Sequence, residues 1–200
     1  TFNAYSAGIT DDRLINLQNG TQKTFDVSES FSASKFLSFF GRAEYSYADK
    51  YYFDASVRND ASSRFGPNNR NATFWAVGGM WKMKNESFMQ NAYWLNDLNL
   101  KVSYGTQGNA SIGNYQHYAL LSSSTNYAEG SSMVVGQPSN PGLTWEQQAL
   151  LTVGFNGRIG DRVDFNVEYY NRKTSSMLMD VPYNYTTGFS SLYANVGGLL

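Results

Sequence analysis

The chain has 200 residues and a formal net charge of −1, with 15 Lys and Arg against 16 Asp and Glu. This balance provides no basic surface to attract nucleic acid, so we expect no nucleic-acid partner. The absence of cysteine excludes disulfides, thiolate metal sites and cysteine nucleophiles. Aromatic residues make up 16% of the chain, a composition that favours β-strands.

The first clear pattern is a period-two alternation over residues 37–47, in which apolar and aromatic residues occupy the odd positions. After the short stretch Ala48-Asp49-Lys50, the alternation resumes over residues 51–60. Two alternating segments separated by so short a connection predict a tight β-hairpin.

Further alternating segments follow in chain order, and each predicts a strand with one apolar and one polar face. They cover approximately residues 72–82, 98–106, 143–156 and 163–173. After Asn85, the residues Phe88, Ala92 and Leu95 recur at helical spacing, which predicts a short amphipathic helix before the fourth strand.

The connections alternate between short turns and longer polar segments rich in Ser, Asn and Gly. The longer ones cover approximately residues 61–71, 107–142 and 174–195. Outer-membrane barrels place short turns in the periplasm and long loops outside the cell, so these three segments are predicted outer loops. No run of about 18 apolar residues occurs, so a transmembrane helix is not expected.

A soluble antiparallel sandwich would alternate in the same way, but its apolar face would be a core of Val, Ile and Leu. The apolar face here is heavily aromatic, and the rings lie near the expected strand ends, where a barrel has its interfacial girdle. The predicted girdle residues are Tyr45, Tyr47, Tyr51, Trp75, Trp81, Tyr104, Trp145 and Tyr169. The pattern therefore favours an all-β fold of antiparallel, up-and-down transmembrane β-barrel strands.

Charged side chains fall on the opposite, polar face, and we predict that they face the lumen. They are Arg42, Glu44, Asp54, Arg58, Glu168 and Arg172. One interpretation is a charged lumen that hydrates a passage or contacts substrate, and the other is a ladder of cross-strand ion pairs that holds the wall together.

The long loop offers a candidate binding surface. Its residues Tyr115, Tyr118 and Tyr127 could stack on sugar rings or peptide side chains. His117 is the only histidine, so a hydrolytic triad would have to rest on a loop residue. We predict no enzyme activity, no catalytic residue, no cofactor and no metal site, with a barrel hydrolase as the enzymatic alternative.

Several strings are more specific than the alternation. The longest runs from Arg58 to Arg70 and reads RNDASSRFGPNNR. Others, in chain order, are Phe40-Gly41-Arg42, Gly79-Met80-Trp81, Ser103-Tyr104-Gly105, Asn140-Pro141-Gly142-Leu143-Thr144-Trp145-Glu146, Thr187-Gly188-Phe189 and Asn195-Val196-Gly197. Their order and spacing over roughly residues 40–197 resemble the C-terminal half of the barrel in the SusC/RagA family of TonB-dependent transporters. Ala61 stands where that family usually has Gly.

This resemblance implies a 22-stranded barrel, closed by an N-terminal plug, in the outer membrane of a Gram-negative bacterium of the Bacteroidota type. It implies contact with outer-membrane lipid and a SusD-like surface lipoprotein that acts as a lid. It also implies import of oligosaccharides or peptides, with energy delivered through TonB.

The sequence contains neither a plug domain nor a TonB box, so we expect these 200 residues to belong to a longer polypeptide. Six to eight strands would leave two open edges, and unpaired backbone groups in lipid cost several kcal/mol each. The alternative is a small self-contained outer-membrane barrel that acts as a receptor or adhesin.

Overall fold

The computed structural model describes residues 2–5, 26–29, 31–125 and 131–199. The chain divides into two compact units, residues 1–33 and 34–200. In the first unit, strands β1 (Phe2–Tyr5) and β2 (Asp26–Glu29) pair in antiparallel orientation. The second unit carries all of the strands predicted from the alternation.

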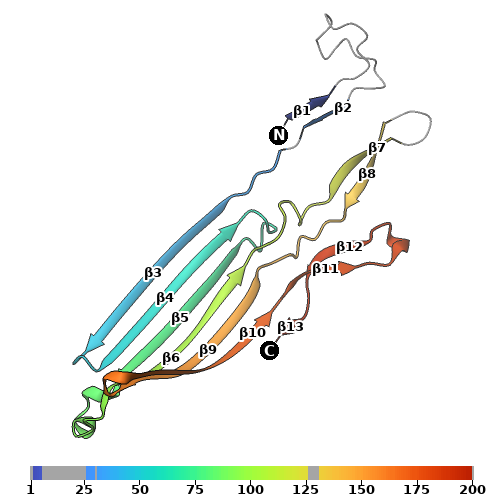
Figure 1. Ribbon diagram of the computed structural model, residues 1–200. Helices are drawn as coiled ribbons and strands as arrows, with labels where there is room; N and C mark the ends of the chain where they lie inside the picture. The colour runs from blue at the N-terminus through green and yellow to red at the C-terminus, as the bar shows by residue number, and fades with distance from the viewer. Residues whose placement is uncertain (1, 6–25, 30, 126–130, 200) are drawn as a thin grey trace, which may run out of the picture. The chain divides into compact units, whose positions relative to one another are not determined.

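Within its described residues, the second unit is built on a seven-stranded antiparallel sheet in which neighbours follow the chain order (Figure 1). The sheet is not closed, and β3 forms one edge and β13 the other. Its strands are β3 (Phe36–Tyr47), β4 (Tyr51–Ser62), β5 (Asn71–Lys82), β6 (Leu95–Asn109), β9 (Glu146–Ile159), β10 (Val163–Ser175) and β13 (Gly198–Leu199).

The six long strands lie over the six alternating segments. Strand β6 extends three residues beyond its expected bounds at each end, and β9 is displaced by three residues towards the C-terminus. Strand β9 begins at Glu146 and not at Leu143 as expected. The reason is a turn, in which the Leu143 amide donates to the Asn140 carbonyl at 3.2 Å. Leu143 is fully buried in loop packing, so its apolar character reflects a core position outside the sheet.

Two predicted outer loops contain hairpins of their own. Strands β7 (Leu120–Thr125) and β8 (Ser131–Gln137) pair between β6 and β9, and strands β11 (Leu178–Pro182) and β12 (Ser191–Asn195) pair after β10. Both hairpins leave the sheet from the end at which β4, β6 and β10 finish (Figure 1). We call this the loop end, and the opposite end of the sheet the turn end.

The predicted amphipathic helix at the turn end is wrong. Residues 83–89 instead form two 3₁₀ turns, η3 (Met83–Asn85) and η4 (Ser87–Met89), separated by an extended Glu86. Leu95 is buried as the first residue of β6, whereas Phe88 is exposed. The predicted helix does not form because side-chain contacts hold Glu86 in an extended conformation.

The Glu86 carboxylate connects three elements at the turn end. It accepts hydrogen bonds from the Tyr51 hydroxyl at 2.7 Å, from Lys50 Nζ at 3.0 Å and from Trp81 Nε1 at 3.2 Å. These donors, led by Tyr51, lower the pKa of Glu86 from its ordinary value of 4.5. The ionised carboxylate thus fixes the β5–β6 connection against the β3–β4 turn.

We expect acid to weaken this attachment. Because the folded state lowers the pKa of Glu86, its stabilising contribution is complete above pH 4.5 and is lost as the pH falls through the lower folded value. Glu86→Gln should abolish this acid-dependent increment, and Tyr51→Phe should shrink it. Amide hydrogen exchange of residues 83–94 across the acid range measures the effect, and an identical pH profile in Glu86→Gln would contradict it.

The register aligns the apolar residues of successive strands on one face. Tyr45 pairs with Phe53, and Val102 pairs with Val153 in the same cross-strand row. These side chains lack a covering layer within the described residues, since Phe53 is 56% exposed and Val102 is 43% exposed. A face this broad and apolar is not left in water by ordinary soluble proteins.

Candidate functional site

A compact hydrophobic cluster lies at the loop end, where the long connections leave the sheet. Phe65 comes from the β4–β5 connection, Ile112 from the β6–β7 connection and Leu143 from the β8–β9 connection. Phe65 and Leu143 are fully buried. We call this the loop-end cluster, and its members are Phe65, Phe74, Ile112, Leu143 and Trp145.

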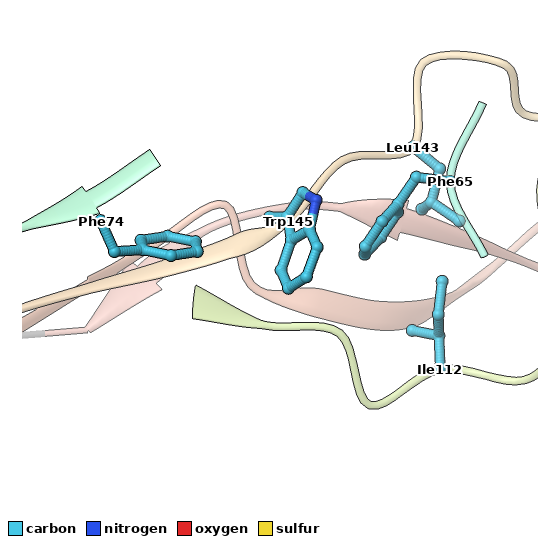
Figure 2. Close-up of a cluster of buried hydrophobic side chains, with 5 residues drawn as sticks. All are labelled: Phe65, Phe74, Ile112, Leu143 and Trp145. Carbon is cyan, nitrogen blue, oxygen red and sulfur yellow. The ribbon is translucent and has the colours of Figure 1, made fainter. Parts of the chain in front are cut away.

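Trp145 occupies the middle of the loop-end cluster (Figure 2), with its ring centroid 5.1 Å from that of Phe65 and 5.8 Å from that of Phe74. Its indole Nε1 donates to the Arg70 carbonyl at 2.9 Å, which satisfies the one polar atom of the side chain. Trp145 is only 3% exposed, so its predicted place in an interfacial girdle is wrong. A ring enclosed by protein on all sides cannot face lipid headgroups.

Asn195 attaches the β11–β12 hairpin to the residues preceding β9. Its Oδ1 accepts from the Thr144 amide at 2.8 Å. Its Nδ2 donates to the Thr144 carbonyl at 2.7 Å and to the Ser176 carbonyl at 2.9 Å. A single amide side chain therefore satisfies three backbone groups from two connections.

Arg64 and His117 join the β4–β5 and β6–β7 connections beside the cluster. Arg64 donates to Asn114 Oδ1 at 3.1 Å and to the Ala110 carbonyl at 3.0 Å. His117 is 3% exposed, with Nδ1 3.1 Å from the Arg64 carbonyl oxygen. The neighbours of His117 are thus backbone and aromatic groups, an arrangement typical of a structural histidine.

The predicted loop tyrosines have different surroundings. Tyr118 is 48% exposed with its ring centroid 3.9 Å from that of His117, whereas Tyr115 is half-buried. Gln137 Nε2 donates to the carbonyls of both residues, at 3.1 Å for Tyr115 and 2.9 Å for Tyr118. Tyr127 lies outside the described residues. Tyr118 therefore presents an accessible ring on a restrained backbone.

A cavity of about 490 Å³ opens on the polar face next to the loop-end cluster. Its lining includes Ser56, Arg58, Asp60, Phe74 and Gln107. Arg58 Nε lies 2.6 Å from Asp60 Oδ1, and the Asp60 side chain is 8% exposed whereas that of Arg58 is 53% exposed. The buried carboxylate thus orients a guanidinium group that still reaches the cavity.

The six residues predicted to face the lumen all project from this polar face. Glu44 pairs directly with Asp54. Arg42 and Arg172 lie in one cross-strand row that runs from β3 to β10. The ion pairs Arg42–Glu44 and Arg58–Asp60 run along single strands and not across strands. They contribute less to holding strands together than a cross-strand ladder would.

The remaining predicted girdle residues project from the apolar face. Tyr51 stacks on Trp81 with ring centroids 6.3 Å apart at the turn end, and Trp75 lies 5.5 Å from Tyr104 towards the loop end. Tyr45, Tyr47 and Tyr169 are each at least 60% exposed. Contact of these rings with lipid headgroups stays a prediction.

Among the side chains that the structure describes, no group of three or more His, Asp or Glu residues could hold a metal ion. The same part of the chain has no helix long and apolar enough to cross a membrane.

Residues 1–199 match the family described as "TonB dependent receptor-like, beta-barrel". The chain belongs to this family. TonB-dependent receptor P26 of Formosa agariphila is 36% identical over an alignment of 202 residues, and this alignment includes 96% of this chain and 20% of that protein. TonB-dependent receptor SusC of Bacteroides thetaiotaomicron is 31% identical over 172 residues, which cover 82% of this chain and 17% of that protein.

This chain superimposes on the structure of the RagAB peptide importer in its "closed-closed" state with a TM-score of 0.80 and 42% sequence identity. The matched part is 94% of this chain and 21% of that chain. The "open-open" state gives a TM-score of 0.75 at the same identity. This chain therefore spans about a fifth of the length of these relatives. It is a stretch of a TonB-dependent receptor barrel of the SusC/RagA type, a family of transporters and receptors rather than enzymes.

The most specific strings of this receptor barrel meet at the loop end. Phe65 and Trp145 lie in ring contact, and Asn195 binds both backbone groups of Thr144. At Gly66, an added Cβ would lie 2.6 Å from the Pro141 carbonyl oxygen, so only glycine fits there without a shift. These strings build the framework that positions the connections at the loop end.

Alternation placed Asp60 on the polar face but did not predict the cavity, its residues Phe74 and Gln107, or the structural role of Asn195. Asp60 and Asn195 stand inside two of the matching strings, so the strings were the available signal for them. Phe74 and Gln107 stand in none of these strings. Their place in the cavity lining depends on which strands become neighbours in the sheet.

Proposed function

We propose that this chain forms part of the wall of an outer-membrane importer that takes up oligosaccharides or peptides. The observation that carries the proposal is the two-sided sheet, in which the apolar face would contact lipid and the polar face would line the passage. The cavity on the polar face combines aromatic rings with Arg58 and Gln107, a mixture that suits both sugar rings and peptide groups.

The similarity to a peptide importer supports an import function, at 42% identity over 94% of this chain. We further propose that a SusD-like surface lipoprotein covers the loop end and that TonB supplies energy through residues outside this stretch. The restrained outer connections support the first point, because a lid needs a surface of fixed shape to close against.

Adjacent residues of β4 provide a matched test. Ser56 lines the polar-face cavity, whereas Ala55 is paired with Ala43 and Val77 on the apolar face. In the full-length transporter, Ser56→Trp should narrow the cavity and reduce substrate uptake several-fold, because passage depends on the width and the polar lining of the channel. Ala55→Trp places the same ring on the other face and should leave uptake unchanged.

Uptake of labelled oligosaccharide or peptide by intact cells is the measurement, with the amount of each variant in the outer membrane as the control for assembly. Arg58→Met provides a second variant, which removes the positive charge from the cavity without adding volume. Normal uptake in both polar-face variants would contradict the proposal that this face lines the passage. Binding to the cell surface without uptake by the unaltered protein would favour the receptor or adhesin alternative.

A further inference from the structure

The connection between β5 and β6 exposes three large aromatic side chains at the turn end. Phe88 and Trp94 are each 63% exposed, and Tyr93 is 87% exposed. Aromatic rings are seldom left this open in a short connection, because their burial contributes strongly to folding. We therefore expect these three rings to contact another molecule or the membrane.

The backbone that carries these rings is held in place at several points. Lys84 Nζ donates to the Met89 carbonyl at 3.2 Å and to the Ala92 carbonyl at 2.7 Å. The Gly160 amide donates to the Trp94 carbonyl at 2.8 Å, which ties the connection to the next turn. The rings are thus presented by a restrained segment, and ordering this segment on contact with a partner would cost little entropy.

The segment continues the apolar face of the sheet. Phe88 makes an edge contact with Trp81, with ring centroids 6.4 Å apart and an interplanar angle of 64°. Trp81 belongs to the cross-strand row of Tyr47, Tyr51 and Leu100 on the apolar face. Phe88 therefore extends the surface that the proposed function assigns to lipid.

The charges of the segment are satisfied internally. The Lys84 ammonium group binds two backbone carbonyls, and Glu86 accepts from Lys50, Tyr51 and Trp81. The segment offers no free charge pattern for an oppositely charged protein surface, whereas amphipathic rings fit the polar headgroup region of a bilayer.

We propose that residues 83–94 rest in the phospholipid headgroup region of the periplasmic leaflet, with Phe88, Tyr93 and Trp94 inserted among the headgroups. This inference rests on the proposed function, because it requires the apolar face to contact lipid. Residues 83–94 would then contact the membrane and not project into water.

Site-directed spin labelling of the full-length transporter in phospholipid nanodiscs tests the inference. This stretch contains no cysteine, so single nitroxides can be placed by Tyr93→Cys and Trp94→Cys in a background free of other cysteines. Two reference sites calibrate the result: Val102→Cys in the middle of the apolar face, and Arg162→Cys in the exposed turn between β9 and β10.

Relaxation by dissolved oxygen, which partitions into lipid, is compared with relaxation by a water-soluble nickel chelate. We expect oxygen to dominate at position 102 and nickel to dominate at position 162, with positions 93 and 94 between them. Nickel accessibility at 93 and 94 equal to that at 162 would overturn the inference. Protection from both reagents would also overturn it, because it would indicate a protein partner. Loss of the oxygen preference at 102 would instead contradict the proposed function.

Discussion

Replacing Phe65 with alanine is expected to loosen the whole loop end of the sheet. Phe65 is fully buried and packs against Trp145, so removing the ring leaves a cavity among residues from three connections. Truncation of a buried Phe costs about 3–5 kcal/mol, and this cost should appear as easier local opening. Amide hydrogen exchange should accelerate at least about a hundredfold in residues 63–70 and 138–145 of the full-length protein.

Phe53→Ala is the matched control, because Phe53 lies on the apolar face and is 56% exposed. Truncation there removes a ring that has no packed cluster around it, and exchange at the loop end should remain as in the unaltered protein. Equal effects of Phe65→Ala and Phe53→Ala would show that the loop-end cluster does not hold the connections at the loop end.

The second large effect is expected from Asn195→Asp, which keeps the shape of the side chain and removes its N–H donors. The Asn195 amide donates to the carbonyls of Thr144 and Ser176, so a carboxylate would place negative charge against two carbonyl oxygens. Loss of these hydrogen bonds and the new repulsion should cost about 2–4 kcal/mol. Limited proteolysis should then cut residues 176–196 faster, as the β11–β12 hairpin detaches.

Asn184→Asp provides the same chemical change where only an acceptor is needed. Asn184 Oδ1 accepts from the Thr186 amide at 3.1 Å at the start of η6 (Tyr185–Thr187), and aspartate serves this capping role equally well. Its proteolysis rate should stay close to that of the unaltered protein. A similar rate for Asn195→Asp would mean that the hairpin is held by other contacts.

Period-two alternation was enough to assign the six long strands and their two faces. Period-two alternation is a local property, since successive side chains of a strand point to opposite sides whatever the strand pairs with. Residues such as Tyr45 and Arg42 could therefore be assigned to opposite faces before any neighbour was known, and the register bears this out. The sequence strings that resemble the SusC/RagA family are likewise recognised from the sequence alone.

Which residues meet at the loop end depends on how the strands pair in three dimensions. Phe65, Trp145 and Asn195 are far apart along the chain, and their contacts arise because three connections leave the same end of one sheet. Trp145 illustrates the limit of local patterns, because alternation placed it on a lipid-facing strand and packing buried it. Glu86 is a second example. Its three hydrogen-bond donors come from segments that are paired through the sheet, and these contacts prevent the helix that the local spacing predicted. Alternation reports the direction of a side chain, whereas burial and partners depend on which distant segments the fold brings beside it.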